Sequence, residues 1–188
     1  MMRIDNEIQM ALKAYGGDIR QALLDNQRLD YFYALSDQRE LLLEWYDFEK
    51  DARLLQAGAD YGALTGLFRS EVARVTVLDE AQEALETVRL RYPSAKNIDY
   101  VQKSLEEYAP EAPAMYDYVV IAGQGKALCR QEAEAAKRLL KPTGILIAAV
   151  PNTLGMKYWA GTKREENGLT KAQLQSMLCG EAGFLRFY

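Results

Sequence analysis

Residues 52–66 read ARLLQAGADYGALTG, and this stretch decides the fold. It opens with an apolar run containing Leu54 and Leu55, passes through a turn-forming segment from Gly58 to Gly62, and then becomes compatible with a helix. This order predicts a strand, a glycine turn and a helix. Such a turn lets backbone N–H groups and a helix N-terminus approach a ligand closely.

The next predicted strand strengthens this interpretation. The apolar run 75–78 ends in Asp79, about 20 residues after the first strand, where doubly wound α/β folds place the acid that holds a nucleoside ribose. Glycines alone would be a weak signal. The glycine turn and Asp79 together predict a nucleoside-binding site.

From residue 53 onward, strand and helix patterns alternate. We predict strands at 53–57, 74–78, 98–102, 116–122 and 144–150, and helices near 63–71, 80–91, 126–140 and 170–182. This alternation predicts a Rossmann-like α/β fold, with a doubly wound, mostly parallel sheet and helices on both faces. Residues 1–50 are predicted to form a helical cap, and residues 51–188 one Rossmann-like domain.

The cap itself carries helix signals. Apolar residues at helical spacing end at Gly16 and Gly17, and Asp18 is placed to cap the following helix. A further helix is predicted to start at Ser36 and to run through Phe48.

Composition excludes several classes of partner and location. The net charge is −4 and no basic stripe is present, so we expect no nucleic-acid partner. No apolar run approaches the roughly 18 residues that a membrane span needs. The N-terminus is acidic and lacks a signal-peptide layout, so we expect a cytoplasmic protein.

The chain has no histidine and two cysteines, Cys129 and Cys179. The missing histidine excludes His-based triads, His-ligated zinc and a histidine general base. Each cysteine lies in a helical pattern, and we expect buried thiols rather than a disulfide. No metal site is predicted, because hard-cation sites need clustered carboxylates or carbonyls.

The glycine turn and the acidic strand end resemble the first motif of class I S-adenosylmethionine-dependent methyltransferases. Gly58 and Gly62 match its outer glycines, whereas Gln56 replaces the preferred acid and Asp60 replaces the middle glycine. Asp60 can adopt the left-handed conformation, so the turn is expected to survive, although its charge would lie beside the pocket. The resemblance implies S-adenosylmethionine as cofactor and S-adenosylhomocysteine as product.

The resemblance also implies where the cofactor lies. Its ribose would meet Asp79, and its adenine would lie near Ser104 and Leu105. Lys103 and Ser104 stand where many family members have an acid, a third departure, and an ordinary loop there is an equal alternative. The expected cofactor-binding residues are Gly58, Ala59, Asp60, Gly62, Asp79, Glu80, Ser104, Leu105 and Gly123.

Two segments follow the fourth and fifth strands at the edge where ligands bind in open α/β folds. Residues 123–125 read GQG, and residues 151–161 are aromatic and could form a lid or an acceptor platform, or equally a hydrophobic plug. The expected acceptor-side residues are Gln124, Asn152, Lys157 and Tyr158. No catalytic residue is assigned.

The segment after the fifth strand, NTLGMKYWAG, resembles bacterial methyltransferase domains associated with glycosyltransferases and cell-surface glycan proteins. This resemblance implies a small-molecule or glycan-precursor acceptor. A full sheet of this family would need roughly 20 more residues, so we expect a fragment of a longer protein or a missing seventh strand. An exposed sheet edge could then pair two copies into a dimer.

Three functions remain open at this point. An active methyltransferase is placed first. A catalytically degenerate domain that serves as a binding or scaffolding module is second, because three cofactor positions depart from the family. A nicotinamide-dependent oxidoreductase is third, because Asp79 suits its ribose equally well but the turn is not G-x-G-x-x-G.

Overall fold

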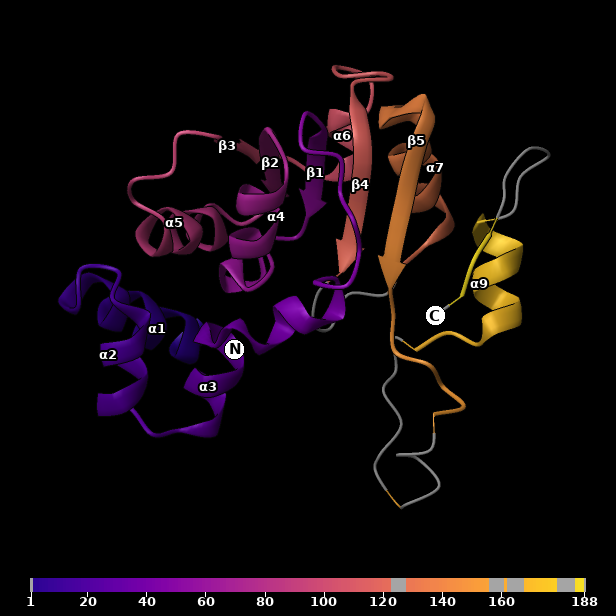
Figure 1. The fold of residues 1–188 in the computed structure, drawn as a ribbon. Helices are drawn as coiled ribbons and strands as arrows, with labels where there is room; N and C mark the ends of the chain where they lie inside the picture. The colour runs from indigo at the N-terminus through magenta and orange to yellow at the C-terminus, as the bar shows by residue number, and fades with distance from the viewer. Residues whose placement is uncertain (1, 123–127, 156–160, 162–167, 179–184, 188) are drawn as a thin grey trace.

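The computed structural model describes residues 2–122, 128–155, 161, 168–178 and 185–187. Its centre is a five-stranded sheet in the order β3-β2-β1-β4-β5, and every described strand pairing is parallel (Figure 1). The strands are β1 (Arg53–Ala57), β2 (Arg74–Asp79), β3 (Ile98–Gln102), β4 (Tyr116–Ala122) and β5 (Leu140–Ala149). The predicted Rossmann-like fold is confirmed.

The start of β5 differs from its predicted position. The strand begins at Leu140 rather than at residue 144, because Leu140 pairs with Tyr116 ahead of a bulge. Regular pairing resumes where Ile145 lies beside Tyr118. Pro142, which lies in the bulge, has no N–H to give to a ladder, so the sequence there does not look like a strand.

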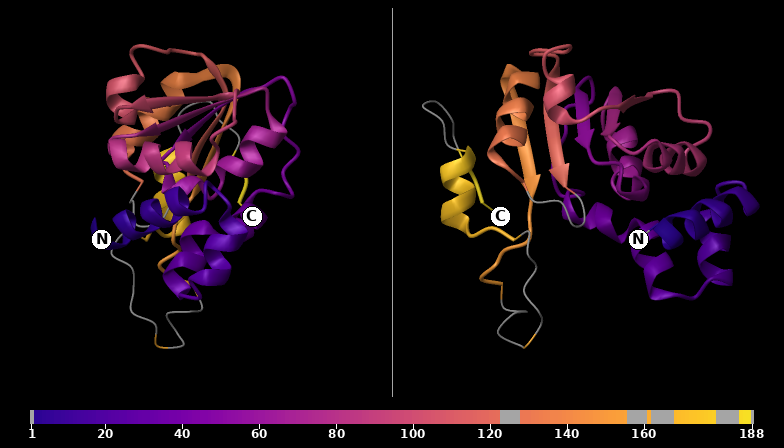
Figure 2. Two further views of the ribbon diagram at one scale, coloured as in Figure 1. Left: turned by 90° about the vertical axis from the view of Figure 1, so that its left-hand side faces the viewer. Right: turned by 180° about the vertical axis from the view of Figure 1, so that it is seen from behind.

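Helices cover both faces of the sheet (Figure 2). On one face lie α4 (Thr65–Glu71) and α5 (Gln82–Arg91), and on the other lie α6 (Leu105–Tyr108) and α7 (Arg130–Leu139), against which α9 (Lys171–Leu178) packs. Leu54 and Leu55 are adjacent in β1 and both fully buried, but they belong to the cores of opposite faces. This double burial is typical of a central parallel strand.

The N-terminal cap consists of α1 (Met2–Ala14), α2 (Ile19–Asp25), α3 (Leu29–Leu35) and the 3-10 helix η1 (Asp37–Leu42). As predicted, Gly16 and Gly17 end the first helix in left-handed conformations, and the Asp18 side chain caps α2 by accepting the Gln21 N–H. The predicted helix from Ser36 to Phe48 is too long. It stops at Leu42 because the chain turns toward β1 and buries Phe48 in the sheet core.

The cap packs against α5, below it in Figure 1 and on the side toward which the strands point. Its core includes the buried residues Ile8, Leu12 and Leu35. Tyr61 and Leu90 pack against this core, so the cap reaches both the glycine turn and α5. The cap is therefore in a position to support the predicted ligand site.

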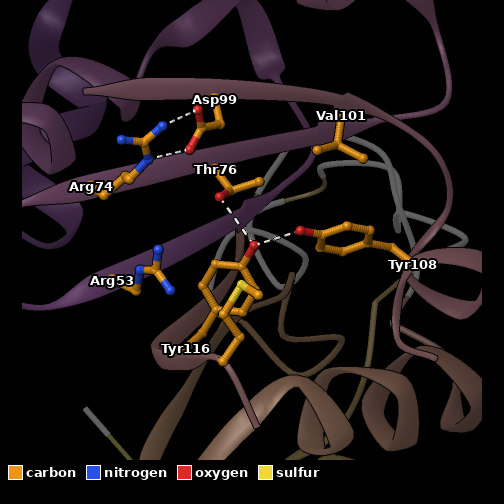
Figure 3. A pocket seen from close by; sticks show the side chains of 8 residues that line it. Arg53, Arg74, Thr76, Asp99, Val101, Tyr108 and Tyr116 are labelled. Atoms are coloured by element: carbon orange, nitrogen blue, oxygen red, sulfur yellow. Dashed lines mark hydrogen bonds and ion pairs between the residues drawn. The ribbon is translucent and has the colours of Figure 1, made fainter. Parts of the chain in front are cut away.

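At the opposite end of the strands, α6 places Tyr108 against the start of β4. The Tyr116 hydroxyl donates to Thr76 Oγ1 at 3.1 Å and lies 2.8 Å from the Tyr108 hydroxyl (Figure 3).

No described helix is both long and apolar enough to cross a membrane.

Candidate functional site

The glycine turn between β1 and α4 has an unusual backbone. Gly58 has φ 94°, and Asp60, Tyr61 and Gly62 follow with φ of 42°, 55° and 74°. The predicted left-handed conformation of Asp60 is confirmed, whereas that of Tyr61 was not anticipated. Three successive left-handed residues, two of which carry side chains, cost free energy that surrounding contacts must offset.

The two outer glycines serve different needs. A Cβ on Gly62 would lie 3.1 Å from the Tyr92 ring and 3.2 Å from Arg91 Cδ, so both its φ and its surroundings favour glycine. A Cβ on Gly58 would meet no atom within 4 Å. The open space in front of Gly58 leaves room for a ligand to approach the backbone.

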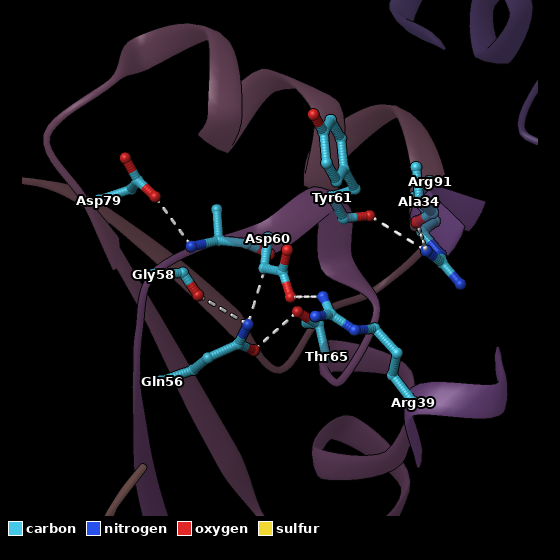
Figure 4. A network of polar contacts seen from close by, with 10 residues as sticks. Ala34, Arg39, Gln56, Gly58, Asp60, Tyr61, Thr65, Asp79 and Arg91 are labelled. Carbon is cyan, nitrogen blue, oxygen red and sulfur yellow. Dashed lines mark hydrogen bonds and ion pairs between the residues drawn. The ribbon is translucent and has the colours of Figure 1, made fainter. Parts of the chain in front are cut away.

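Asp79, at the end of β2, contacts the turn (Figure 4). Its Oδ2 accepts the Ala59 N–H at 2.8 Å, and its Oδ1 accepts the Ala81 N–H at 2.9 Å. Each carboxylate oxygen keeps a further lone pair, so Asp79 can still accept hydrogen bonds from hydroxyl groups. Glu80 follows it on the surface.

Gln56 supports the turn from below. Its side chain is fully buried, and its Nε2 donates to Gly58 O at 2.9 Å and to Ala59 O at 3.4 Å. Its Oε1 accepts the Thr65 hydroxyl at 2.7 Å (Figure 4). An ionised acid has no proton to donate to the two carbonyls. This departure from the family pattern therefore has a structural role, joining β1, the turn and α4.

Asp60, the second departure, forms an ion pair with Arg39 of η1. The side chains are 24% and 11% exposed for Arg39 and Asp60, so the pair is largely shielded from water. The negative charge expected beside the pocket is thus compensated by the cap. Arg39 was not among the predicted site residues, because no sequence pattern links it to Asp60.

A second arginine also connects the cap to the turn. The Arg91 guanidinium, on a residue that is 6% exposed, donates to the carbonyls of Ala34, Leu35 and Tyr61 at 3.2, 2.8 and 3.1 Å. Hydrogen bonds of this kind offset the cost of burying a charge. The neighbouring Tyr92 hydroxyl donates to Gly62 O at 3.0 Å, and burial raises the pKa of Tyr92, which keeps this donor protonated.

At the predicted adenine side, Lys103 and Ser104 form a short loop that leads into α6. Ser104 caps α6: its Oγ accepts the Glu107 N–H at 3.2 Å, and its own N–H donates to Glu107. Leu105 is 3% exposed and packs in the sheet core, so a ligand could reach it only through its backbone. Lys103 forms a salt bridge with Glu111.

Of the remaining predicted residues, Gly123, Gln124, Lys157 and Tyr158 lie outside the described residues. Asn152 is exposed beyond the carboxyl end of β5, and its Oδ1 accepts the Leu154 N–H at 3.0 Å. It thus lies on the edge of the sheet that carries Gly58, as an acceptor-side residue would.

The sequence pattern placed Cys129 inside a helix, but in the structure it is the half-buried N-cap of α7. Its Sγ accepts the Glu132 N–H at 3.4 Å, and its N–H donates to Glu132 at 3.0 Å. Glu106, Cys129 and Glu132 bring potential ligand atoms within 4.8 Å of one another. We assign no metal to this group, because two of its members already cap α7. Cys179 lies outside the described residues.

Comparisons with known proteins agree with this geometry. Residues 54–144 match the family model of a methyltransferase domain. A ubiquinone biosynthesis O-methyltransferase of Klebsiella pneumoniae is 33% identical over 110 residues, covering 57% of this chain and 45% of that protein. The chain thus spans less than half the length of this curated relative. The expected cofactor, S-adenosylmethionine, agrees with the family match.

Solved structures agree on the fold. A SAM-dependent methyltransferase of Aquifex aeolicus superimposes with a TM-score of 0.61 at 13% identity, covering 86% of each chain. The N-methyltransferase NodS of Bradyrhizobium japonicum, solved with S-adenosyl-L-homocysteine, has a TM-score of 0.60 at 16% identity, covering 75% of this chain and 71% of its own. At these identities, the likeness establishes the class I methyltransferase fold alone.

Proposed function

Because residues 54–144 match the family model of a methyltransferase domain, we propose that the chain is an S-adenosylmethionine-dependent methyltransferase acting on a small molecule. The observation that carries the proposal is the hydrogen bond from the Ala59 N–H of the turn to the Asp79 carboxylate, beside the open space at Gly58 and at the carboxyl edge of the sheet. Ligands of open α/β folds bind at this edge.

The residues present fit the cofactor. The space in front of Gly58 admits a ligand to the backbone, and Asp79 has lone pairs left for two ribose hydroxyls. Arg39 balances the charge of Asp60, so the turn does not repel a ligand carboxylate. When bound, S-adenosylmethionine would supply the methyl group and leave as S-adenosylhomocysteine.

The chain's own task is to align the acceptor in line with the methyl group and to exclude water. With no histidine in the sequence, the acceptor proton would pass to a carboxylate, lysine or tyrosine, or directly to solvent. We keep Gln124, Asn152, Lys157 and Tyr158 as the proposed acceptor-side residues.

For the acceptor, a hydroxyl group is the first class to test, because the curated relative is named as an O-methyltransferase of ubiquinone biosynthesis. A glycan precursor, suggested by the segment after β5, is the second class. The association with glycan proteins, the cytoplasmic location and a dimer through the sheet edge stay predictions.

The structure gives no support to the degenerate alternative. Gln56 and Asp60, two of the three departures that suggested it, have partners that hold the turn in place. The nicotinamide alternative is likewise disfavoured by the family match.

Isothermal titration with S-adenosylmethionine and S-adenosylhomocysteine tests the proposal. We expect micromolar binding that Asp79→Ala weakens by about 10- to 100-fold, since hydrogen bonds to a charged group contribute about 1.5–3 kcal/mol. Asp79→Asn, which keeps the side-chain volume, should show a smaller loss. Asp51→Ala removes an exposed acid before β1 and should leave the affinity for both ligands unchanged. Absence of binding by the well-folded chain would contradict the proposal.

A further inference from the structure

A second cavity lies at the opposite end of the sheet from the glycine turn. It has a volume of about 240 Å³ and lies beside the amino ends of β1, β2 and β4, next to α6 (Figure 3). Arg53 begins β1 and Gly58 directly follows its last residue, and at about 3.3 Å per residue the two are roughly 16 Å apart along the strand direction. The cavity is therefore separate from the proposed cofactor site.

Two arginines, Arg53 and Arg74, line this cavity side by side. They are register partners on β1 and β2, so their side chains leave the same face of the sheet. Arg74 is paired with Asp99, its Nε and Nη2 lying 2.5 and 2.7 Å from the two carboxylate oxygens. Like charges directly across neighbouring strands are destabilising. An anion placed between the two guanidinium groups would relieve this repulsion.

Arg53 has capacity left for such an anion. Within the described part of the chain, its guanidinium makes no hydrogen bond or ion pair, whereas its backbone N–H donates to Asp117. Arg53 and Arg74 together carry two positive charges against the single negative charge of Asp99. The cavity walls are therefore positive overall, and one cation is uncompensated.

The back wall adds a neutral donor. Two hydrogen bonds join the hydroxyl groups of Tyr108, Tyr116 and Thr76, so one of their three protons is not used within this set. Burial raises the pKa of Tyr116, so this wall adds no negative charge. Val101 and Met115 supply apolar surface beside it.

We propose that this cavity binds a small organic acid, with its carboxylate between Arg53 and Arg74 and its uncharged body against Val101 and Met115. Planar guanidinium groups match carboxylates in geometry as well as in charge. A volume of 240 Å³ equals that of about eight liquid waters, which suits an acid with a single ring.

Fluorine NMR with 4-fluorobenzoate as the probe tests the site on the full chain. We expect saturable binding with a dissociation constant of about 1 mM or below, and at least about tenfold weaker binding of the uncharged 4-fluorobenzamide. Arg53→Gln should weaken benzoate binding about tenfold, and it should fold normally because its exposed side chain has no partner to lose. Arg20→Gln, an equal charge change on an exposed arginine of α2, should leave the affinity unchanged.

Several results would overturn the proposal. The proposal fails if 4-fluorobenzoate does not bind saturably, if 4-fluorobenzamide binds equally well, or if Arg53→Gln binds 4-fluorobenzoate with unchanged affinity. Displacement of the probe by inorganic phosphate at equal concentration would also count against it, since charge alone would then be recognised. Saturating S-adenosylhomocysteine should leave the probe bound, and displacement by it would mean that both ligands occupy one site. The outcome does not depend on whether the chain transfers methyl groups.

Discussion

The underside and the outer side of the glycine turn are held in different ways. Below the turn, the buried and uncharged Gln56 side chain donates to two carbonyls of the turn and accepts the hydroxyl of the buried Thr65. On its outer side, Asp60 and Arg39 make a partly exposed ion pair with the cap. Both contacts involve positions that depart from the family's first motif, yet one departure is neutral and the other charged.

The difference follows from solvation. A charge beneath the turn would be removed from water with no opposite charge beside it, which is costly, whereas an amide satisfies two carbonyls and a hydroxyl at once. On the outer side, both charges keep some contact with water and with each other. The comparison teaches that an altered motif position should be judged by its new partners, because a departure from the family pattern can still support the same turn.

The strongest test of this comparison is Gln56→Glu, which introduces the acid that the family prefers. We expect the free energy of unfolding to fall by about 3 kcal/mol or more at neutral pH, because a buried carboxylate would face two carbonyl oxygens. Urea unfolding measures the loss. Gln131→Glu, an exposed change on α7, should alter the free energy of unfolding by no more than about 0.5 kcal/mol. An equally stable Gln56→Glu variant would show that the underside does not require a neutral donor.

A double-mutant cycle of Arg39→Gln and Asp60→Asn tests the outer side. We expect a coupling free energy of about 1–2 kcal/mol, between that of exposed and fully buried pairs, because both side chains are mostly shielded. Urea unfolding of the four proteins gives the value. Arg39→Gln alone should also weaken S-adenosylmethionine binding, since Asp60 would be left uncompensated. Additive single effects would contradict a structural role for the pair.

The smallest expected effect concerns Glu40, next to Arg39. Burial raises the pKa of Glu40, and the positive charge of Arg91 only partly opposes the increase. The folded state therefore favours the protonated carboxyl. The stability that protonated Glu40 contributes is fully present below the ordinary glutamate pKa of about 4.3 and is lost as the pH rises through the raised pKa of the folded state.

Glu40→Gln, which stays neutral, should thus raise the free energy of unfolding by a few tenths of a kcal/mol at pH 7 and have no benefit near pH 4. Urea unfolding across this pH range measures the difference. Glu44→Gln, at an exposed glutamate nearby, provides the matched control. The same benefit at both pH values would argue against a raised pKa as the cause.

Local sequence patterns predicted most of the sheet. The bounds of β1, β3 and β4 are confirmed, because short apolar runs bounded by turns are a direct signal of buried strands. The early start of β5 depends on the pairing of Leu140 with Tyr116, which no local pattern reveals. The short helix α6 depends on a capping box at Ser104, whose sequence signal was overlooked.

The candidate site was predictable only where residue type or the spacing typical of the fold specifies it. The left-handed Asp60 and the approach of Asp79 to the turn follow from residue type and spacing. The contributions of Arg39 and Arg91 do not, because no spacing typical of the fold links these arginines to the turn. A single sequence carries no record of such pairings.

Arg91 has one further consequence. Its guanidinium donates hydrogen bonds to the last carbonyls of α3 and to the Tyr61 carbonyl at the same time. If either segment moved away from Arg91, a buried cation would lose hydrogen-bond acceptors. The end of α3 and the glycine turn should therefore open together as one cooperative unit. In native-state hydrogen exchange, their slowest amides would share a single opening free energy, which a ligand seated on the turn would raise in both segments at once.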